Sequence, residues 1–260
     1  MSVEADPQAL EPEAPAIKTE ISQWQIIRSH PSIIAGGILL GIMILIAVFG
    51  PLFTSDPVAL NPIKRLKPPQ ADFLFGTDFL GRDIFARVVH GARISLVVGL
   101  AVSAVAVGIG LVVGMISGYI RILDAIIMRI MDGLMSIPAI LLAIALISLS
   151  GATLTTVIIA IVVPEVPRVV RLVRSVVLTV REEPYVEAAI AAGTKLPLIL
   201  SRHILPNTIA PLIVQATYIC GSAMLTESIL GFLGAGIPPE IPSWGNIMAE
   251  GRTYFQLSPW

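Results

Sequence analysis

Long runs without a charged residue are the feature that most restricts how this chain can fold. Residues 33–53, 94–120 and 133–164 contain no Asp, Glu, Lys or Arg. An α-helix rises about 1.5 Å per residue, so about 20 apolar residues cross the roughly 30 Å hydrocarbon layer of a bilayer. Helices also satisfy their own backbone hydrogen bonds, which lipid cannot do. The sequence therefore predicts an all-α polytopic membrane protein.

Composition supports membrane lipid as the surroundings of this chain. Of the 260 residues, 55% are hydrophobic and 13% are charged, whereas soluble domains carry about 25% charged residues. The net charge of −1 lacks the basic excess of nucleic-acid-binding proteins, so no nucleic-acid partner is expected. Cys220 is the one cysteine, which rules out a disulfide within the chain.

The charge-free runs predict five transmembrane helices. Residues 1–31 are acidic and proline-rich at their start, and we expect a disordered cytoplasmic tail followed by a pre-membrane segment. Residues 54–93 contain several prolines and charges and predict an extracytoplasmic loop. The run 133–164 is too long for one helix, and SLSGATLTT divides it near Gly151. The predicted spans are 32–53, 94–120, about 128–149, about 153–174 and about 208–234.

Lysine and arginine predict the orientation, because cytoplasmic loops carry more of them. With the N-terminus in the cytoplasm, ten of the 17 basic residues fall inside and seven outside. The densest basic segment, residues 168–202, also falls inside. The segment between the fourth and fifth predicted spans, residues 181–207, is therefore expected to face the cytoplasm.

Residues 181–207 form an unusually long polar connection. Pro184 suits the first turn of a helix, and Gly193 is a residue at which a helix stops. Pro197 then opens a second piece, and Pro206 marks the boundary with the fifth predicted span. Ordinary connections in helical bundles have about 2–8 residues. We interpret this segment as a helix–turn–helix for docking a partner; the alternative is a simple interhelical loop.

Ionisable residues within spans are candidates for function, because charges in lipid are costly. Glu165 with Arg168 and Arg129 with Asp132 are spaced to pair on one helix face. Glu227 has no such local partner, so interhelical hydrogen bonding and pore lining both stay open for it. Small residues recur in the second span and predict close helix packing: Gly99, Ser103, Gly108, Gly110, Gly114 and Gly118.

The sequence contains no motif for chemistry of its own. There is no phosphate-binding G-x-x-x-x-G-K-[ST] motif, so we expect no ATP site on this chain. His30, His90 and His203 are far apart, and no nucleophile–base arrangement is evident. We expect no catalytic residue, no metal site and no bound cofactor.

Several stretches together resemble the inner-membrane permeases of binding-protein-dependent ABC importers. Glu187-Ala188-Ala189, then Gly193, then Ile204-Leu205-Pro206 look like the EAA signature of that family. The segments GTDFLGRDIFARVVHGARISL, DAIIMRIMDGLMSIPAILLAIAL and ESILGFLGAGIPPEIPSWGNIMAEGR resemble its peptide/nickel branch, specifically the second, or C-type, permease subunit. The resemblance covers roughly residues 25–260.

The resemblance implies the transmembrane domain of a type I ABC importer, with residues 94–260 as the permease core. It implies that residues 181–207 form a cytoplasmic coupling loop that docks on an ATPase. The residues implied in that coupling are Glu187, Ala188, Ala189, Gly193, Ile204, Leu205 and Pro206. The implied partners are a second permease subunit, two cytoplasmic ATPases that use ATP and Mg²⁺, and an extracytoplasmic substrate-binding protein.

The expected function is import of di- or oligopeptides across a bacterial inner membrane, with this chain as a non-catalytic permease subunit. The alternative within the branch is transport of nickel or another small solute, and a stand-alone secondary carrier is a third hypothesis. Family members have a sixth span after the SPW motif, whereas this sequence ends at Trp260. The resemblance does not choose between these substrates or identify the pore-lining residues.

Overall fold

The computed structural model describes residues 30–260, and this range is helical without a β-strand. The predicted all-α class is confirmed. The predicted disordered tail lies almost entirely outside the described residues. The structure divides into two units, residues 1–42 and 43–260. The described part of the first unit is the start of α2 (Pro31–Phe49), an uncharged helix that continues into η1 (Gly50–Leu52) and agrees with the first predicted span.

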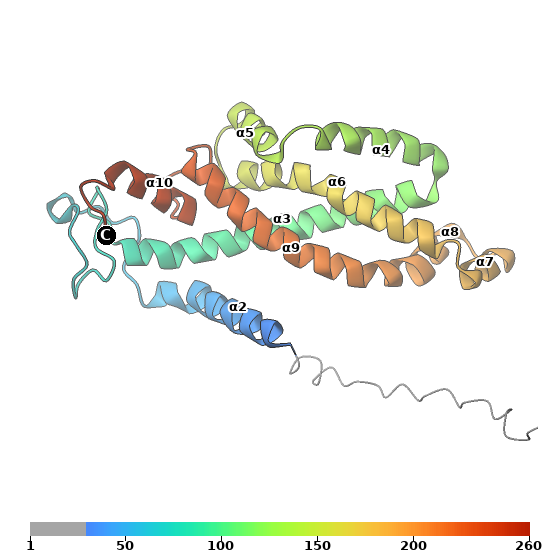
Figure 1. The fold of residues 1–260 in the computed structure, drawn as a ribbon, viewed down its shortest axis with the longest axis horizontal. Coiled ribbons are helices and arrows are strands. Elements are labelled where there is room, and N and C mark those ends of the chain that lie inside the picture. The colour runs from blue at the N-terminus through green and yellow to red at the C-terminus, as the bar shows by residue number, and fades with distance from the viewer. Residues whose placement is uncertain (1–29) are drawn as a thin grey trace, which may run out of the picture. The chain divides into compact units, whose positions relative to one another are not determined.

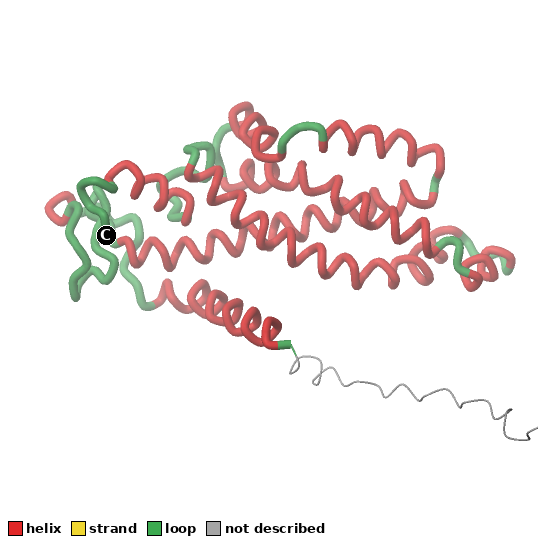
Figure 2. Tube along the Cα trace, in the orientation of Figure 1, coloured by secondary structure: helices red, strands yellow, loops and turns green. Residues whose placement is uncertain are grey.

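Three long helices form the centre of the second unit: α3 (Ile84–Tyr119), α6 (Leu154–Val180) and α9 (Leu205–Phe232) (Figure 1). Helices α4 (Arg121–Met135) and α5 (Ala139–Ser150) pack on α6. At one end lie α7 (Pro184–Ala191), α8 (Leu196–Ile199) and the π-helix η3 (Leu200–Ile204). At the other lie α10 (Trp244–Tyr254) and the loop with η2 (Pro62–Lys64) (Figure 2).

Glycines of α3 bring this helix into close contact with α6. A Cβ atom at Gly110, Gly114 or Gly118 would lie 2.4–2.6 Å from a valine Cβ of α6, closer than two carbon atoms can approach. The valines are Val169, Val173 and Val177, each fully buried. Ser103 donates a hydrogen bond to the backbone oxygen of Ala216 in α9 at 2.8 Å. The predicted packing role of these small residues is confirmed except at Gly108, which faces open space.

Helix α3 begins ten residues earlier than the charge-free run suggested, so the expected loop 54–93 is shorter in the structure. Asp83 caps the helix: its carboxylate accepts a hydrogen bond from the Phe85 N–H at 2.9 Å. The first turns carry Arg87, His90 and Arg93, whose polarity made this segment look like a loop. A helix is possible in this segment because Arg87 forms ion pairs with Asp78 and Glu250 within the fold.

The third predicted span, about 128–149, is not one straight helix. Helices α4 and α5 meet at an 88° bend across residues 136–138. Pro138 disfavours helical geometry in the residue before it. The Ser136 hydroxyl donates to the Gly133 backbone oxygen at 2.7 Å, which occupies a carbonyl at the end of α4. Helices α4 and α5 together are therefore a broken span or a re-entrant segment.

The predicted count of five spans exceeds what length and composition support in residues 30–260. Three helices there are long and apolar enough to cross a membrane, and a fourth is added if α4 and α5 form one span. Helix α6 has 27 residues, long enough for a bilayer, but Glu165, Arg168, Arg171 and Arg174 lie within it. Because of these charges, α6 is not one of the three apolar helices, although it is long enough to cross a bilayer.

Replacing Gly114 by leucine should destabilise the fold. The added side chain would collide with Val173 and with the Val170 backbone oxygen, and overpacking of this kind costs about 1–3 kcal/mol or more. We expect a lower Tm for the purified, detergent-solubilised chain. Gly108→Leu is the matched control, because no atom lies within 4 Å of its Cβ position. An equal Tm for both variants would contradict the proposed importance of the α3–α6 contact.

Candidate docking site

Helix α7 is a short helix with defined ends. Pro184 occupies its first turn, and Val186 is fully buried as part of the hydrophobic core. At the other end, the Gly193 N–H donates to the Ile190 oxygen at 2.9 Å and the Thr194 N–H donates to the Ala189 oxygen at 3.1 Å. This is the Schellman pattern, and Gly193 has the positive φ of 79° that the pattern requires. The predicted helix stop at Gly193 is therefore present.

The second piece continues directly into α9. Helices α8, η3 and α9 together form one helix, Leu196–Phe232. Ile199 and Ile204 are buried in the core. The expected boundary at Pro206 agrees with the start of α9 at Leu205, but the π-helix η3 before it joins α8 to α9 without a break in the helix. A displacement of α8 would therefore be transmitted to α9.

Side chains hold this segment to the ends of the long helices. The Asn207 amide of α9 donates to the Tyr185 hydroxyl of α7 at 3.2 Å, and the Tyr185 ring lies 6.1 Å from the His203 ring. Arg181, which follows α6, donates to the Gly118 backbone oxygen of α3 at 3.1 Å. Helix α7 is therefore attached near both α6 and α9.

The structure separates the seven predicted coupling residues into surface and core. Glu187, Ala188, Gly193 and Pro206 are exposed, Ala189 and Leu205 are half-buried, and Ile204 is fully buried. Large apolar side chains are exposed beside them: Tyr185, Ile190, Leu196 and Leu198, each between 37% and 50%. This exposed surface of α7 and α8 combines small residues with apolar ones. Such a surface fits protein contact, since interface cores are apolar and poor in charge.

Glu227 lies inside the packing of the chain. Its side chain is fully buried, and neither carboxylate oxygen has a hydrogen-bond partner that meets normal geometry. The hydroxyl groups of Ser228 and Ser243 are close enough to interact with it electrostatically. The two hypotheses from the sequence, interhelical hydrogen bonding and pore lining, both stay predictions for this buried carboxylate.

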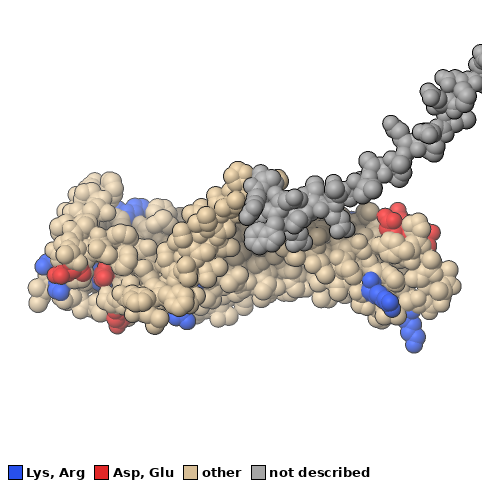
Figure 3. Space-filling model, turned by 90° about the horizontal axis from the view of Figure 1, so that it is seen from below, with Lys and Arg blue, Asp and Glu red and all other residues tan. Residues whose placement is uncertain are grey.

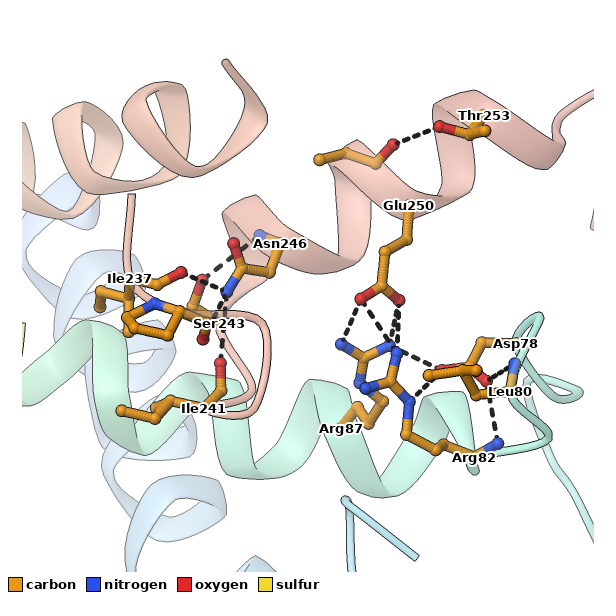
Figure 4. A network of polar contacts seen from close by, with 12 residues as sticks. Asp78, Leu80, Arg82, Arg87, Ile237, Ile241, Ser243, Asn246, Glu250 and Thr253 are labelled. Carbon is orange, nitrogen blue, oxygen red and sulfur yellow. Dashed lines mark hydrogen bonds and ion pairs between the residues drawn. The ribbon is translucent and has the colours of Figure 1, made fainter. Parts of the chain in front are cut away.

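A buried ionic cluster at the opposite end was missed by sequence reasoning (Figure 4). It consists of Asp78 in the loop, Arg82, Arg87 of α3 and Glu250 of α10. Asp78 accepts from Arg82 at 2.6 Å and from Arg87 at 2.8 Å; Glu250 accepts from Arg82 at 2.9 Å and also pairs with Arg87. Two carboxylates balance two guanidinium groups, so the cluster is neutral.

Two further contacts hold α10 in place. The Trp244 indole N–H donates to the Val88 backbone oxygen of α3 at 3.1 Å. The Asn246 amide donates to the Ile237 backbone oxygen at 2.9 Å, as Figure 4 shows. Glu250 is 163 residues from Arg87 in sequence, and no local spacing indicates such a pairing. The one signal was the density of charges in FGTDFLGRDIFAR beside an apolar run.

Comparison with known proteins identifies the family. The model of the binding-protein-dependent transport system inner membrane component matches residues 106–257. This chain belongs to that family. The N-terminal transmembrane domain of oligopeptide transport permease C matches residues 22–69 of the permease. The resemblance stated from the sequence motifs is thereby confirmed.

Curated relatives match the permease over most of its length. It is 53% identical over 246 residues to a probable peptide ABC transporter permease of Sinorhizobium fredii, covering 95% of this chain and 84% of the relative. It is 43% identical over 248 residues to a dipeptide transport system permease of Alkalihalophilus pseudofirmus, covering 93% and 82%. It is 36% identical over 249 residues to an oligopeptide transport system permease of Bacillus subtilis, covering 94% and 82%.

Replacing Glu250 by glutamine should destabilise the permease by about 3 kcal/mol or more, because Arg82 and Arg87 would lose a buried counter-charge. We expect a Tm several degrees lower for the purified protein. Glu240→Gln is the control, since Glu240 is exposed and has no ion pair among the described residues. A Tm unchanged in Glu250→Gln would show that the cluster contributes little to stability.

Proposed function

We propose that this permease is the transmembrane subunit of an ATP-driven ABC importer for di- or oligopeptides. The printed names of its relatives support this substrate class, since the three relatives described above are all named for peptide transport. Nickel or another small solute of the same branch has no comparable support. A stand-alone secondary carrier would not need a docking surface such as that of α7 and α8.

One observation carries the coupling role: α7 is a capped helix with an exposed surface, attached to both α6 and α9. Binding an ATPase to that surface would move the ends of both long helices together. Packed helices change position as discrete rearrangements rather than by smooth bending. ATP and Mg²⁺ would bind to two partner ATPases, and the permease itself would remain non-catalytic.

The proposed arrangement in the membrane follows from this docking role. The end of the second unit with α7 and α8 would face the cytoplasm, as would the N-terminus of the chain. The end with α10 and the loop before α3 would face outward and receive the substrate-binding protein. A second permease would complete the translocation pathway in the bacterial inner membrane.

The test of this function is purification of the tagged chain from its native membrane in mild detergent, with co-purifying proteins identified by mass spectrometry. We expect a second permease and ATPase subunits. The purified assembly, reconstituted in liposomes with its binding protein, should take up a dipeptide only when ATP is supplied. A chain that is isolated alone and is active without ATP would refute the proposal.

Changing the surface of α7 should uncouple uptake from ATP hydrolysis. Glu187→Lys reverses a charge on the exposed surface, and Gly193→Pro removes the N–H bonded to Ile190 and cannot adopt the φ of 79°. We expect dipeptide uptake to fall at least tenfold in each variant, with the chain still inserted in the membrane. Both uptake and ATPase activity would be measured in the reconstituted assembly.

Glu182→Lys is the matched control, because it makes the same charge change before α7 begins, on a side chain that is 76% exposed and whose ion pair with Arg181 is long, at 3.8 Å. It should retain uptake. Normal uptake in both Glu187→Lys and Gly193→Pro would contradict the coupling role of α7.

A further inference from the structure

The exposed surfaces of α3 and α9 are those of helices that face lipid. Their large exposed hydrophobic residues are Val97, Leu100, Val105, Ile109 and Val112 in α3 and Ile209, Ile213, Val214, Tyr218, Leu225 and Ile229 in α9. Apart from Arg93, near the start of α3, no exposed residue of either helix is charged. On the face that Figure 3 shows, the visible charged side chains lie toward the two ends, and the surface between them that grey atoms do not cover is uncharged. Lipid is the natural contact for surfaces of this composition.

Helix α6 presents a different surface. Its exposed residues from the middle of the helix to its end are Arg168, Arg171, Ser175 and Thr179, all of them polar. Their spacing of three, four and four residues places them on one face. The buried valines of α6, including Val169 and Val173, pack against α3. The exposed polar residues are therefore directed away from that contact.

Helix α4 extends this surface. Arg129 and Asp132 are exposed. The Asp132 carboxylate forms an ion pair with the Arg171 guanidinium group of α6, with 2.5 Å between Oδ1 and Nη2. We call the six residues Arg129, Asp132, Arg168, Arg171, Ser175 and Thr179 the polar strip. The side chains of Asp132, Arg168 and Arg171 are 58%, 42% and 44% exposed, so the charges reach the surface.

The polar strip carries three arginines and one aspartate, and the buried Glu165 beside it leaves one cation in excess. Arg171 is paired with Asp132, and Arg168 is paired with Glu165 at 3.1 Å. Glu165 itself is buried, so Arg168 is the exposed member of its pair. Arg129 has no ion-pair partner among residues 30–260. The strip can thus offer a cation to a carboxylate and a carboxylate to an ammonium group.

The depth of the strip excludes lipid as its surroundings. Helix α6 has 27 residues and is therefore about 40 Å long, and Arg168 lies about 21 Å from its start at 1.5 Å per residue. An upright helix would put Arg168 within the hydrocarbon layer, about 30 Å thick. A charged side chain there costs about 2.5–3.5 kcal/mol or more and normally faces a water-filled cavity or the interior of the protein.

We propose that the polar strip is this permease's share of the translocation pathway and binds zwitterionic peptides through their terminal carboxylate and ammonium groups. The proposal rests on the peptide importer function. Two prolines within α6, Pro164 and Pro167, precede the strip directly. Each proline leaves a backbone carbonyl one turn earlier without its usual helical donor. In a membrane helix, such a carbonyl is satisfied by a neighbouring helix, a hydroxyl side chain or ordered water.

Thiol labelling tests whether the strip contacts water. Ser175→Cys and Thr179→Cys would be made in a Cys220→Ala background and assembled with all partner subunits in membranes. A charged, membrane-impermeant methanethiosulfonate reagent should label both. Ile213→Cys is the control on the apolar surface of α9, where Ile213 is 60% exposed, and it should react at least tenfold more slowly. This measurement does not depend on which solute the importer transports.

Labelling of Ser175→Cys at the slow rate of Ile213→Cys would overturn the proposal. A second result would also overturn it: a disulfide or bifunctional cross-link from Ser175→Cys to the second permease, together with protection of this cysteine from the reagent. That result would show that the strip is a protein interface.

Uptake tests the binding chemistry. Arg168→Gln with Arg171→Gln removes two cations but keeps polar side chains, and we expect uptake of dialanine to fall at least tenfold while the ATPase activity of the assembly persists. Arg93→Gln is the control, an exposed arginine outside the strip with no ion pair among the described residues. Unchanged uptake in the double variant would overturn the binding role.

Absence of dialanine uptake by the wild-type assembly would instead refute the peptide function. The labelling result would still decide whether the strip contacts water.

Discussion

The close contact between α3 and α6 is the interaction on which the rest of the structure depends. Lipid gives apolar helices little reason to associate, so membrane helices depend on tight packing of small residues. Gly110, Gly114 and Gly118 meet the valines of α6 at distances that leave no room for a Cβ atom. Because one face of α6 is used in this contact, the direction of its polar residues is determined as well.

Different interactions hold the two ends of the long helices: ion pairs at one end, and apolar burial with a hydrogen bond at the other. At one end, Arg82 and Arg87 share Asp78 and Glu250 in a buried, neutral cluster that attaches α10 to α3. Such a cluster is costly to open, since each buried charge would lose its partner. At the other end, α7 is attached by Val186 and by the Tyr185–Asn207 hydrogen bond. The second attachment consists of one buried apolar side chain and one uncharged hydrogen bond, as suits an element that is proposed to move.

Local sequence signals predicted local structure well. Pro184 and Gly193 indicated the bounds of α7 because first-turn prolines and left-handed glycines act within one turn of helix. The EAA motif likewise indicated the family. Contacts between distant segments were not predictable in this way. Asp132 pairs with Arg171 of another helix rather than with Arg129 as expected, and Glu250 pairs across 163 residues. Charge content also misplaced the start of α3, because Arg87 is neutralised only in the folded chain.

The α6 part of the polar strip is followed in sequence by α7, so a movement of α7 could reach the strip directly through the backbone. Thr179, the last residue of the strip, is five residues before Pro184, where α7 begins. Arg174 binds Asp124 of α4 through two hydrogen bonds, one of 2.6 Å, so α4 would follow α6 when it moves. A displacement of α7 by an ATPase would then shift Arg129, Asp132 and Arg171 together. The groups proposed to hold a peptide would change position as a unit, without any rearrangement of the ionic cluster at the far end.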